Sequence, residues 1–172
     1  LRRYGPLTLT SVARIGAQIA EGLQAAHEKR LIHRDIKPSN IVLLEDLDEV
    51  RITDFGLAHL EGATRLTKSG MLMGTPKYMA PEQARGEKID HRTDLFSLGS
   101  VLYAMCTGRA PFEGKNDAEV VSSVAKHQLI PIETVDPTLP RWLTDIITKL
   151  LQQNPEDRFQ SAQEVAIRLR HS

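Results

Sequence analysis

The segment DLFSLGSVLYAMC, residues 94–106, is the feature that most constrains how this chain can fold. Its residues are apolar on nearly every side, interrupted mainly by glycine and serine. A helix of this kind is buried in the middle of a core, because it has no polar face to turn toward water. The apolar run 98–106 is also far shorter than the roughly 20 residues that cross a bilayer. We therefore predict a central helix that other elements of a globular domain surround.

The composition agrees with one globular domain. The chain has 172 residues, of which 41% are hydrophobic and 26% charged, as is ordinary for such domains. Lys+Arg and Asp+Glu both number 22, so the charge balance favours neither nucleic acid nor an anionic membrane as a partner. We expect no nucleic-acid partner and no membrane segment in this chain.

The cysteine content bears on the cellular compartment. The single cysteine, Cys106, excludes an internal disulfide. In its apolar run we expect a buried, reduced thiol, which favours a cytoplasmic protein. That expectation leaves open a membrane anchor in regions outside this chain.

Four more helices are predicted around the central one. A helical apolar stripe runs through residues 8–29. Asn116 followed by Glu119 resembles a capping box, and Ser161 followed by Glu164 forms one, so a helix is predicted to start at each. Between these starts lies a helical apolar face. Its members are Trp142, Leu143, Ile146, Ile147, Leu150 and Leu151.

A small hairpin completes the prediction. The runs NIVLL (40–44) and VRIT (50–53) have β-type residues and are separated by the acidic EDLDE. Residues 54–92 contain glycine, proline and threonine without a sustained period, and a connection that long is usually functional or disordered. The expected fold is mainly α with one two-stranded β-hairpin.

The stretch HRDIKPSN, residues 33–40, carries the densest chemistry. Pro38 excludes a regular helix here, so a loop brings together a carboxylate (Asp35), an ammonium (Lys37) and a carboxamide (Asn40). The carboxylate can accept a hydroxyl proton, the ammonium can neutralise phosphate charge, and the amide oxygen can bind a hard cation. Asp54, directly after the second predicted strand, supplies another oxygen ligand. These groups suit phosphoryl transfer.

Three motifs in order, HRDIKPSN, DFG (54–56) and APE (80–82), resemble the signature set of the protein kinase family. A lone His-Arg-Asp triplet is usually just an exposed polar loop, whereas the ordered set is highly specific. The similarity continues through GTPKYMAPEQ, DLFSLG, TGRAPFEG and NPEDRF and covers almost the whole chain. It implies that residues 1–172 are the C-terminal lobe of a kinase catalytic domain, with the N-terminal β lobe absent.

The resemblance implies roles for the chemical groups. Asp35 corresponds to the catalytic base that orients the substrate hydroxyl, and Lys37 to the residue that stabilises the transferred phosphoryl group. Asn40 and Asp54 correspond to the ligands of Mg²⁺. Val42 corresponds to a residue that packs beneath the adenine of ATP. Protein substrates are the implied partners.

The resemblance also implies positioning roles. Thr75 matches a threonine that bonds to the His33–Asn40 loop and shapes the substrate site. Glu82 and Arg158 match a buried ion pair, and Asp94 matches the anchor of the His33–Arg34 backbone. Three further positions complete the set: His33 as a packed structural histidine, Phe55, and Gly56, which permits a turn of the backbone.

The class of kinase follows from the same comparison. Lys37, two residues after Asp35, resembles the Ser/Thr-specific pattern. The segment RLTKSGMLMGTPKYMAPEQ is most similar to bacterial members of the eukaryotic-like Ser/Thr kinases. Small-molecule phosphotransferases share the spacing of Asp35 and Asn40 but lack the GTPKYMAPE platform. Arg34 can pair with a phosphate on this segment, for which Thr67 and then Ser69 are the favoured sites.

The elements of an upper kinase lobe are missing. No two glycines lie two residues apart, so there is no G-x-G, and Lys29, at the end of a predicted helix, is the only lysine before His33. The opening LRRYGPL, without a methionine, resembles the segment after the hinge between lobes. We expect a piece of a longer protein that has little kinase activity alone. The alternative is a scaffold or pseudokinase module, which usually lacks the catalytic aspartate or the metal ligands that are present here.

Overall fold

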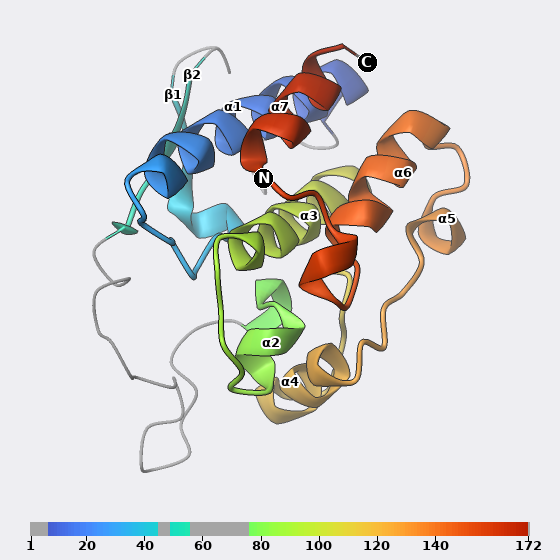
Figure 1. Cartoon of the computed structure of the whole chain (residues 1–172). Coiled ribbons are helices and arrows are strands. Elements are labelled where there is room, and N and C mark those ends of the chain that lie inside the picture. The colour runs from blue at the N-terminus through green and yellow to red at the C-terminus, as the bar shows by residue number, and fades with distance from the viewer. Residues whose placement is uncertain (1–6, 45–48, 56–75, 172) are drawn as a thin grey trace.

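A computed structural model describes residues 7–44, 49–55 and 76–171. The fold is built around α3 (Arg92–Thr107), which is buried at every position from Thr93 to Met105. Helices α1 (Leu9–Glu28) and α6 (Arg141–Leu150) pack on this central helix, and α7 (Ala162–Arg170) packs on α1 (Figure 1). The predicted central helix is thus confirmed.

Two glycines allow the close packing around α3. A Cβ atom on Gly16 of α1 would lie 2.7 Å from Leu102 of α3 and 3.0 Å from Leu169 of α7. A Cβ atom on Gly99 would lie 2.7 Å from the Cβ atom of Leu150 in α6. Both approaches are closer than carbon atoms usually pack. At Gly99 the neighbour is a Cβ atom, which cannot move aside without the backbone, so this contact depends on glycine; at Gly16 the neighbours are the ends of leucine side chains, which would have to shift.

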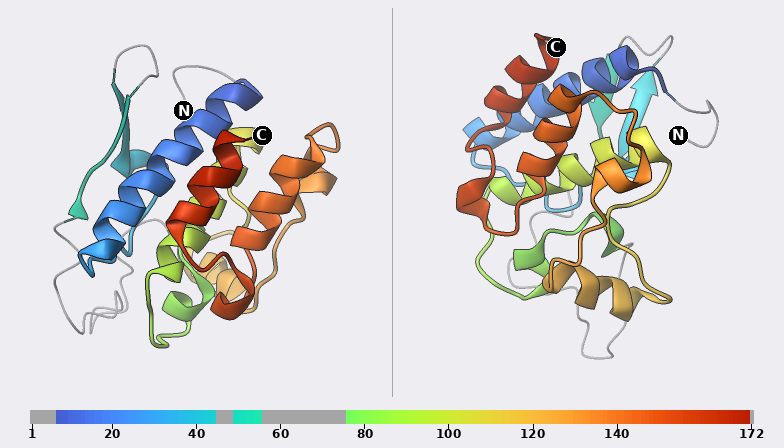
Figure 2. Two further views of the ribbon diagram at one scale, coloured as in Figure 1. Left: turned by 45° about the horizontal axis from the view of Figure 1, so that its top comes forward. Right: turned by 90° about the vertical axis from the view of Figure 1, so that its right-hand side faces the viewer.

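The predicted hairpin is present and lies against α1. Strands β1 (Ile41–Leu44) and β2 (Glu49–Ile52) pair antiparallel, with Ile41 opposite Ile52. The side-chain oxygen of Gln18 in α1 accepts a hydrogen bond from the backbone of Val50 at 2.9 Å. Figure 2 shows the hairpin on the side of α1 away from α7.

Smaller elements form the lower part of the molecule. Helices α2 (Pro81–Ala84) and α4 (Asp117–Ala125) contact each other below α3, and α5 (Ile132–Val135) precedes α6 (Figure 1). Short 3-10 turns cover Pro38–Asn40, Pro76–Tyr78 and Pro155–Asp157. The sequence did not predict α2 and α5, because four residues are too few to show a helical period.

The predicted helix starts agree with the structure. The Asn116 side chain accepts from the backbone of Glu119, and the Ser161 hydroxyl accepts from the backbone of Glu164. Cys106 differs from prediction, because it is only partly buried in the last turn of α3, where the helix leaves the core. Within the described residues, no helix is long and apolar enough to cross a membrane.

Candidate functional site

The His33–Asn40 loop connects α1 to β1 and brings the three predicted chemical groups together. The Nζ atom of Lys37 donates to Oδ2 of Asp35 at 2.8 Å, and the Asp35 side chain is 9% exposed. The Nδ2 atom of Asn40 donates to the Asp35 carbonyl at 2.9 Å and lies 3.4 Å from Oδ2. The Asp35 carboxylate is therefore oriented from both sides while keeping access to solvent.

Asn40 is held by the end of the hairpin. Its carbonyl accepts from the backbone N–H of Thr53 at 2.9 Å and from the Thr53 hydroxyl at 3.3 Å. Its side-chain Nδ2 donates to Asp35. Its Oδ1 accepts from the Ser39 hydroxyl at 3.4 Å, and because an amide oxygen has two lone pairs it can also bind a cation. The side chain is buried.

Asp54 follows Thr53 and is exposed, with a left-handed φ of 65°. Aspartate tolerates this conformation better than most residues. The turn places an exposed carboxylate one residue after the strand end that holds Asn40. An amide oxygen and a carboxylate are the oxygen ligands that Mg²⁺ accepts, so these residues fit the predicted ion. Among the described residues, no cluster of three or more His, Cys, Asp or Glu could hold a metal.

His33, predicted to be a packed structural histidine, is buried, with 1% of its surface exposed. Its Nε2 donates to the Thr53 carbonyl at 2.8 Å, and its Nδ1 accepts from the backbone N–H of Asp35 at 3.3 Å. These partners fix the tautomer, because a carbonyl can only accept and an N–H can only donate. The ring also packs edge-on against Phe55, with centroids 4.6 Å apart.

Asp94, at the start of α3, anchors the same loop from below. Its carboxylate is fully buried and accepts from the backbone N–H groups of His33 at 2.9 Å and Arg34 at 2.8 Å. It also accepts from Nε2 of His27 at 2.8 Å. Sequence reasoning missed His27, since neither its position in the last turn of α1 nor its spacing pointed to a partner 67 residues away.

Arg34 has a left-handed backbone, with φ 67°. Its guanidinium Nε is buried and has no hydrogen-bond partner among the described residues. The predicted phosphate acceptors Thr67 and Ser69 lie outside the described residues, as do Gly56 and Thr75. Val42 is 39% exposed on β1.

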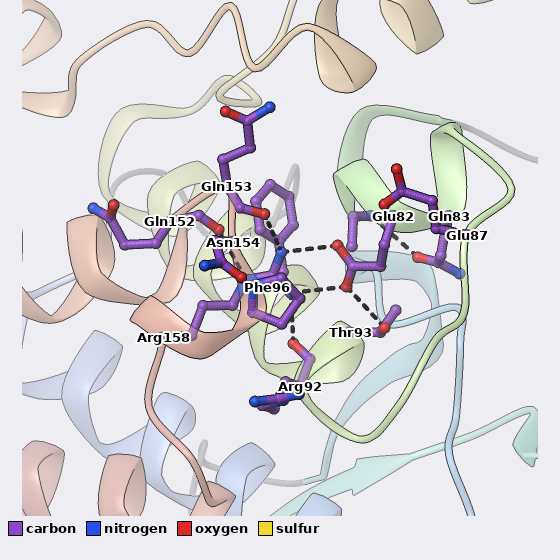
Figure 3. Close-up of polar contacts among 12 residues, drawn as sticks. Glu82, Gln83, Glu87, Arg92, Thr93, Phe96, Gln152, Gln153, Asn154 and Arg158 are labelled. Atoms are coloured by element: carbon purple, nitrogen blue, oxygen red, sulfur yellow. Dashed lines mark hydrogen bonds and ion pairs between the residues drawn. The ribbon is translucent and has the colours of Figure 1, made fainter.

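Glu82 and Arg158 form a buried ion pair between α2 and the segment before α7. The two side chains meet through a pair of 2.8 Å hydrogen bonds and are 3% and 0% exposed. Thr93 donates a further bond to Glu82 at 2.9 Å. The guanidinium also donates to backbone carbonyls of three residues, Arg92, Gln152 and Gln153 (Figure 3).

The charge state of Glu82 follows from these contacts. Burial works to raise the pKa of its carboxyl, but the hydrogen bonds and charge of Arg158, with the Thr93 hydroxyl, leave that pKa below its ordinary value. Glu82 therefore stays ionised at neutral pH. Arg158 also lies over the Phe96 ring, 4.8 Å from its centroid, which adds a cation–π contact.

Comparison with known proteins identifies the family. The model of the family described as "Protein kinase domain" matches residues 1–168. The chain belongs to the protein kinase family. Its relatives include a probable serine/threonine-protein kinase of Clostridium perfringens, which is 37% identical over 96% of this chain and 24% of the relative.

Two other kinase relatives are similarly close. The serine/threonine-protein kinase PkaA of Streptomyces coelicolor is 40% identical over 99% of the chain and 31% of its own length. PknB of Mycobacterium tuberculosis is 35% identical over 94% of the chain and 26% of its own length. The chain thus spans less than a third of each of these kinases, and the bacterial Ser/Thr resemblance expected from the motifs is confirmed.

Proposed function

We propose that this chain is the C-terminal lobe of a Ser/Thr protein kinase that transfers the γ-phosphate of ATP to hydroxyl groups of protein substrates. The observation that carries the proposal is the shared contact of Lys37 and Asn40 with the Asp35 carboxylate. Phosphoryl transfer depends mainly on positioning and on charge stabilisation. This arrangement holds a base, a cation and an amide oxygen at one place on a rigid support.

In this mechanism Asp35 orients the substrate hydroxyl and accepts its proton. Lys37 is 20% exposed beside the carboxylate, so it can contact both Asp35 and the transferred phosphoryl group. Its charge offsets the negative charge that gathers on the phosphoryl oxygens in the transition state. His33 holds the loop and takes no part in proton transfer, since both of its ring nitrogens are occupied by backbone groups.

The cofactors of this proposal are ATP and Mg²⁺. Asn40 through Oδ1 and Asp54 through its carboxylate would hold the metal ion, which neutralises phosphate charge when bound. These two residues are fewer than the six ligands of Mg²⁺, and phosphate oxygens and water would complete the set. Val42, exposed on β1, would pack against the adenine. Because ATP is the donor, we place this lobe in the cytoplasm.

We also propose that an N-terminal lobe in the same protein completes the site. The described residues offer no glycine-rich loop or strand lysine for the phosphates, which kinases need in addition to the lower lobe. The 172-residue chain alone is therefore expected to bind MgATP weakly and to turn over little.

Arg34 supports a regulatory part of the proposal. Its buried Nε lacks a partner among the described residues, and a phosphate on Thr67 or Ser69 would supply one. A charge-assisted bond of this kind orders the segment that carries the phosphate.

A second candidate function is a scaffold or pseudokinase module. It is favoured less, because such modules usually lose a catalytic or metal-binding residue, while Asp35, Lys37, Asn40 and Asp54 are all present here. The two functions differ in one measurable respect: a kinase requires Asp35 for phosphate transfer, whereas a scaffold does not.

The test compares Asp35→Asn with the unmodified sequence in the longest natural polypeptide that contains this chain. Incorporation of phosphate from radiolabelled ATP into casein and into the protein itself is measured. We expect a loss of about 10²-fold or more, since a positioned base contributes about 10²–10⁴-fold. Asp145→Asn, on the exposed face of α6, is the matched control and should be fully active. Equal activity of all three proteins would rule out the kinase mechanism.

A further inference from the structure

The side chain of Gln83 bridges α2 and the His33–Asn40 loop. Its Nε2 donates to the Arg34 carbonyl at 2.9 Å, and its Oε1 accepts from the backbone N–H of Ala80 at 3.1 Å. Ala80 is the residue that precedes α2, so the second bond caps the start of this helix. Gln83 is 49 residues from Arg34 in sequence, and the sequence motifs did not predict this contact.

The carbonyl that Gln83 holds belongs to the peptide bond between Arg34 and Asp35. The N–H of the same peptide donates to Nδ1 of His33 at 3.3 Å. The preceding N–H, that of Arg34, donates to Asp94. The peptide plane is thus fixed at both edges, and it leads directly to the Asp35 carboxylate.

This fixation matters because the Arg34 backbone is in an unfavourable conformation. With φ at 67°, a residue with a side chain is strained by about 1–2 kcal/mol. Such a conformation persists only when surrounding contacts hold it in place. Asp94 holds one side of Arg34, and Gln83 is the side chain that holds its carbonyl.

An amide is required at this position. The Ala80 N–H needs an acceptor and the Arg34 carbonyl needs a donor, and glutamine offers both from one side chain. A glutamate of the same shape could still cap α2, and its charge would favour the N-terminus of a helix. It has no donor, however, and would turn a carboxylate oxygen toward the Arg34 carbonyl. Glutamate therefore separates the capping role from the loop-holding role.

We propose that Gln83 is a positioning residue for Asp35. By holding the peptide between Arg34 and Asp35, Gln83 fixes the position of the Asp35 carboxylate, the proposed base. The inference rests on the proposed kinase function, because the orientation of that peptide affects catalysis only if Asp35 acts as the base. It also links two parts of the site: α2 follows the segment predicted to bind protein substrate, so one amide fixes the start of α2 relative to the base.

The test is Gln83→Glu in the longest natural polypeptide that contains this chain, with kcat and KM for ATP and casein and the melting temperature measured. We expect kcat to fall about 10- to 100-fold, as small misplacements of catalytic groups do, while KM for ATP changes less than about twofold and Tm by less than about 5 °C. Gln163→Glu, an exposed glutamine in the first turn of α7, should leave all values unchanged.

Gln83→Met decides whether the lost donor or the new charge is responsible. Methionine has a similar length and no charge, so it should lower kcat to a similar degree. A drop with Glu but not with Met would assign the effect to charge and overturn the proposal. Unchanged kcat in Gln83→Glu would overturn it as well, and so would a parallel rise in KM with a large loss of Tm, which marks a merely structural role.

Amide hydrogen exchange keeps this inference separate from the proposed function. If the unmodified protein shows no kinase activity, the proposed function fails, and exchange in residues 33–36 then decides the positioning role. Faster exchange there in Gln83→Glu than in Gln163→Glu supports the role of Gln83. Equal exchange in the two variants refutes it.

Discussion

Replacing Arg158 by methionine should destabilise the chain far more than breaking a similar pair on its surface. The substitution keeps an unbranched side chain but removes the guanidinium from its buried pair with Glu82. In the folded chain these side chains are 0% and 3% exposed, so water cannot solvate the carboxylate that remains. The Thr93 hydroxyl, 2.9 Å away, is then its one side-chain partner within the described residues.

The size of the effect follows from this burial. Breaking a buried ion pair from one side typically destabilises a protein by about 3–5 kcal/mol. The upper part of this range is expected, because Arg158 also donates to the carbonyls of Arg92, Gln152 and Gln153. In a domain of this size 1 kcal/mol corresponds to about 2–4 °C, so a loss of about 4–5 kcal/mol should lower Tm by about 8–20 °C.

Thermal unfolding of the 172-residue chain, followed by circular dichroism, measures this effect. The control is Arg170→Met, which breaks another two-bond pair, with Glu21 at 2.6 and 2.9 Å. There the side chains are 53% and 41% exposed, so water solvates the remaining charge and the loss should be far smaller. Equal losses in the two variants would refute the reasoning from burial. Adding Glu82→Gln to Arg158→Met should recover part of the stability, and a further loss would contradict the role of the unpaired charge.

Glu82, Cys106, two glycines and the predicted phosphate acceptors of Arg34 each allow a further test. Acid should weaken the fold through Glu82, whose pKa in the folded chain is below its ordinary value of 4.5. Its contribution to the free energy of unfolding is therefore complete above pH 4.5 and is lost as the pH falls below that value. Urea unfolding measured from pH 7 to pH 3 should show a smaller loss of stability in Glu82→Gln than in the unmodified chain. Burial, followed by the charge of Asp136, raises the pKa of the Cys106 thiol to about 12, so iodoacetamide at pH 8 should label it slowly in the folded chain and quickly in urea; equal rates would contradict this. Gly99→Ala should destabilise the chain by about 1–3 kcal/mol, because the added methyl group would meet the Cβ atom of Leu150 in α6. Gly22→Ala would meet only the end of the flexible Ile52 side chain, so in urea titrations it should lose less stability than Gly99→Ala or gain some. The double variant Thr67→Ala, Ser69→Ala should lower the activity of the autophosphorylated natural polypeptide, and full activity would remove the proposed regulatory role of Arg34.

The sequence predicted the long elements well because their patterns are local. The apolar stripe of α1, the all-apolar α3 and the capping residues Asn116 and Ser161 each report on structure within a few residues. The hairpin was predicted for the same reason. The four-residue helices α2 and α5 were missed, since less than two turns leave no period to detect.

The site shows where local patterns stop. The pairing of Glu82 with Arg158, 76 residues apart, came from family resemblance and not from spacing. His27 and Gln83 were not predicted at all. His27 donates to Asp94, which holds the His33–Asn40 loop, and Gln83 donates to the Arg34 carbonyl within the loop. Their roles depend on which backbone groups the tertiary fold brings within reach, and a histidine or glutamine in a sequence does not reveal that.

The buried carboxylate of Asp94 has a consequence for how this protein fails. It sits at the first turn of the most deeply buried helix and holds two consecutive backbone groups of the His33–Asn40 loop. We therefore expect the loop to unfold together with the core: it should keep its conformation while α3 is folded and lose it when α3 unfolds. Heat inactivation and global unfolding should then occur in a single transition, whereas a substitution at an exposed position such as Asp145 in α6 should leave the chemistry unchanged.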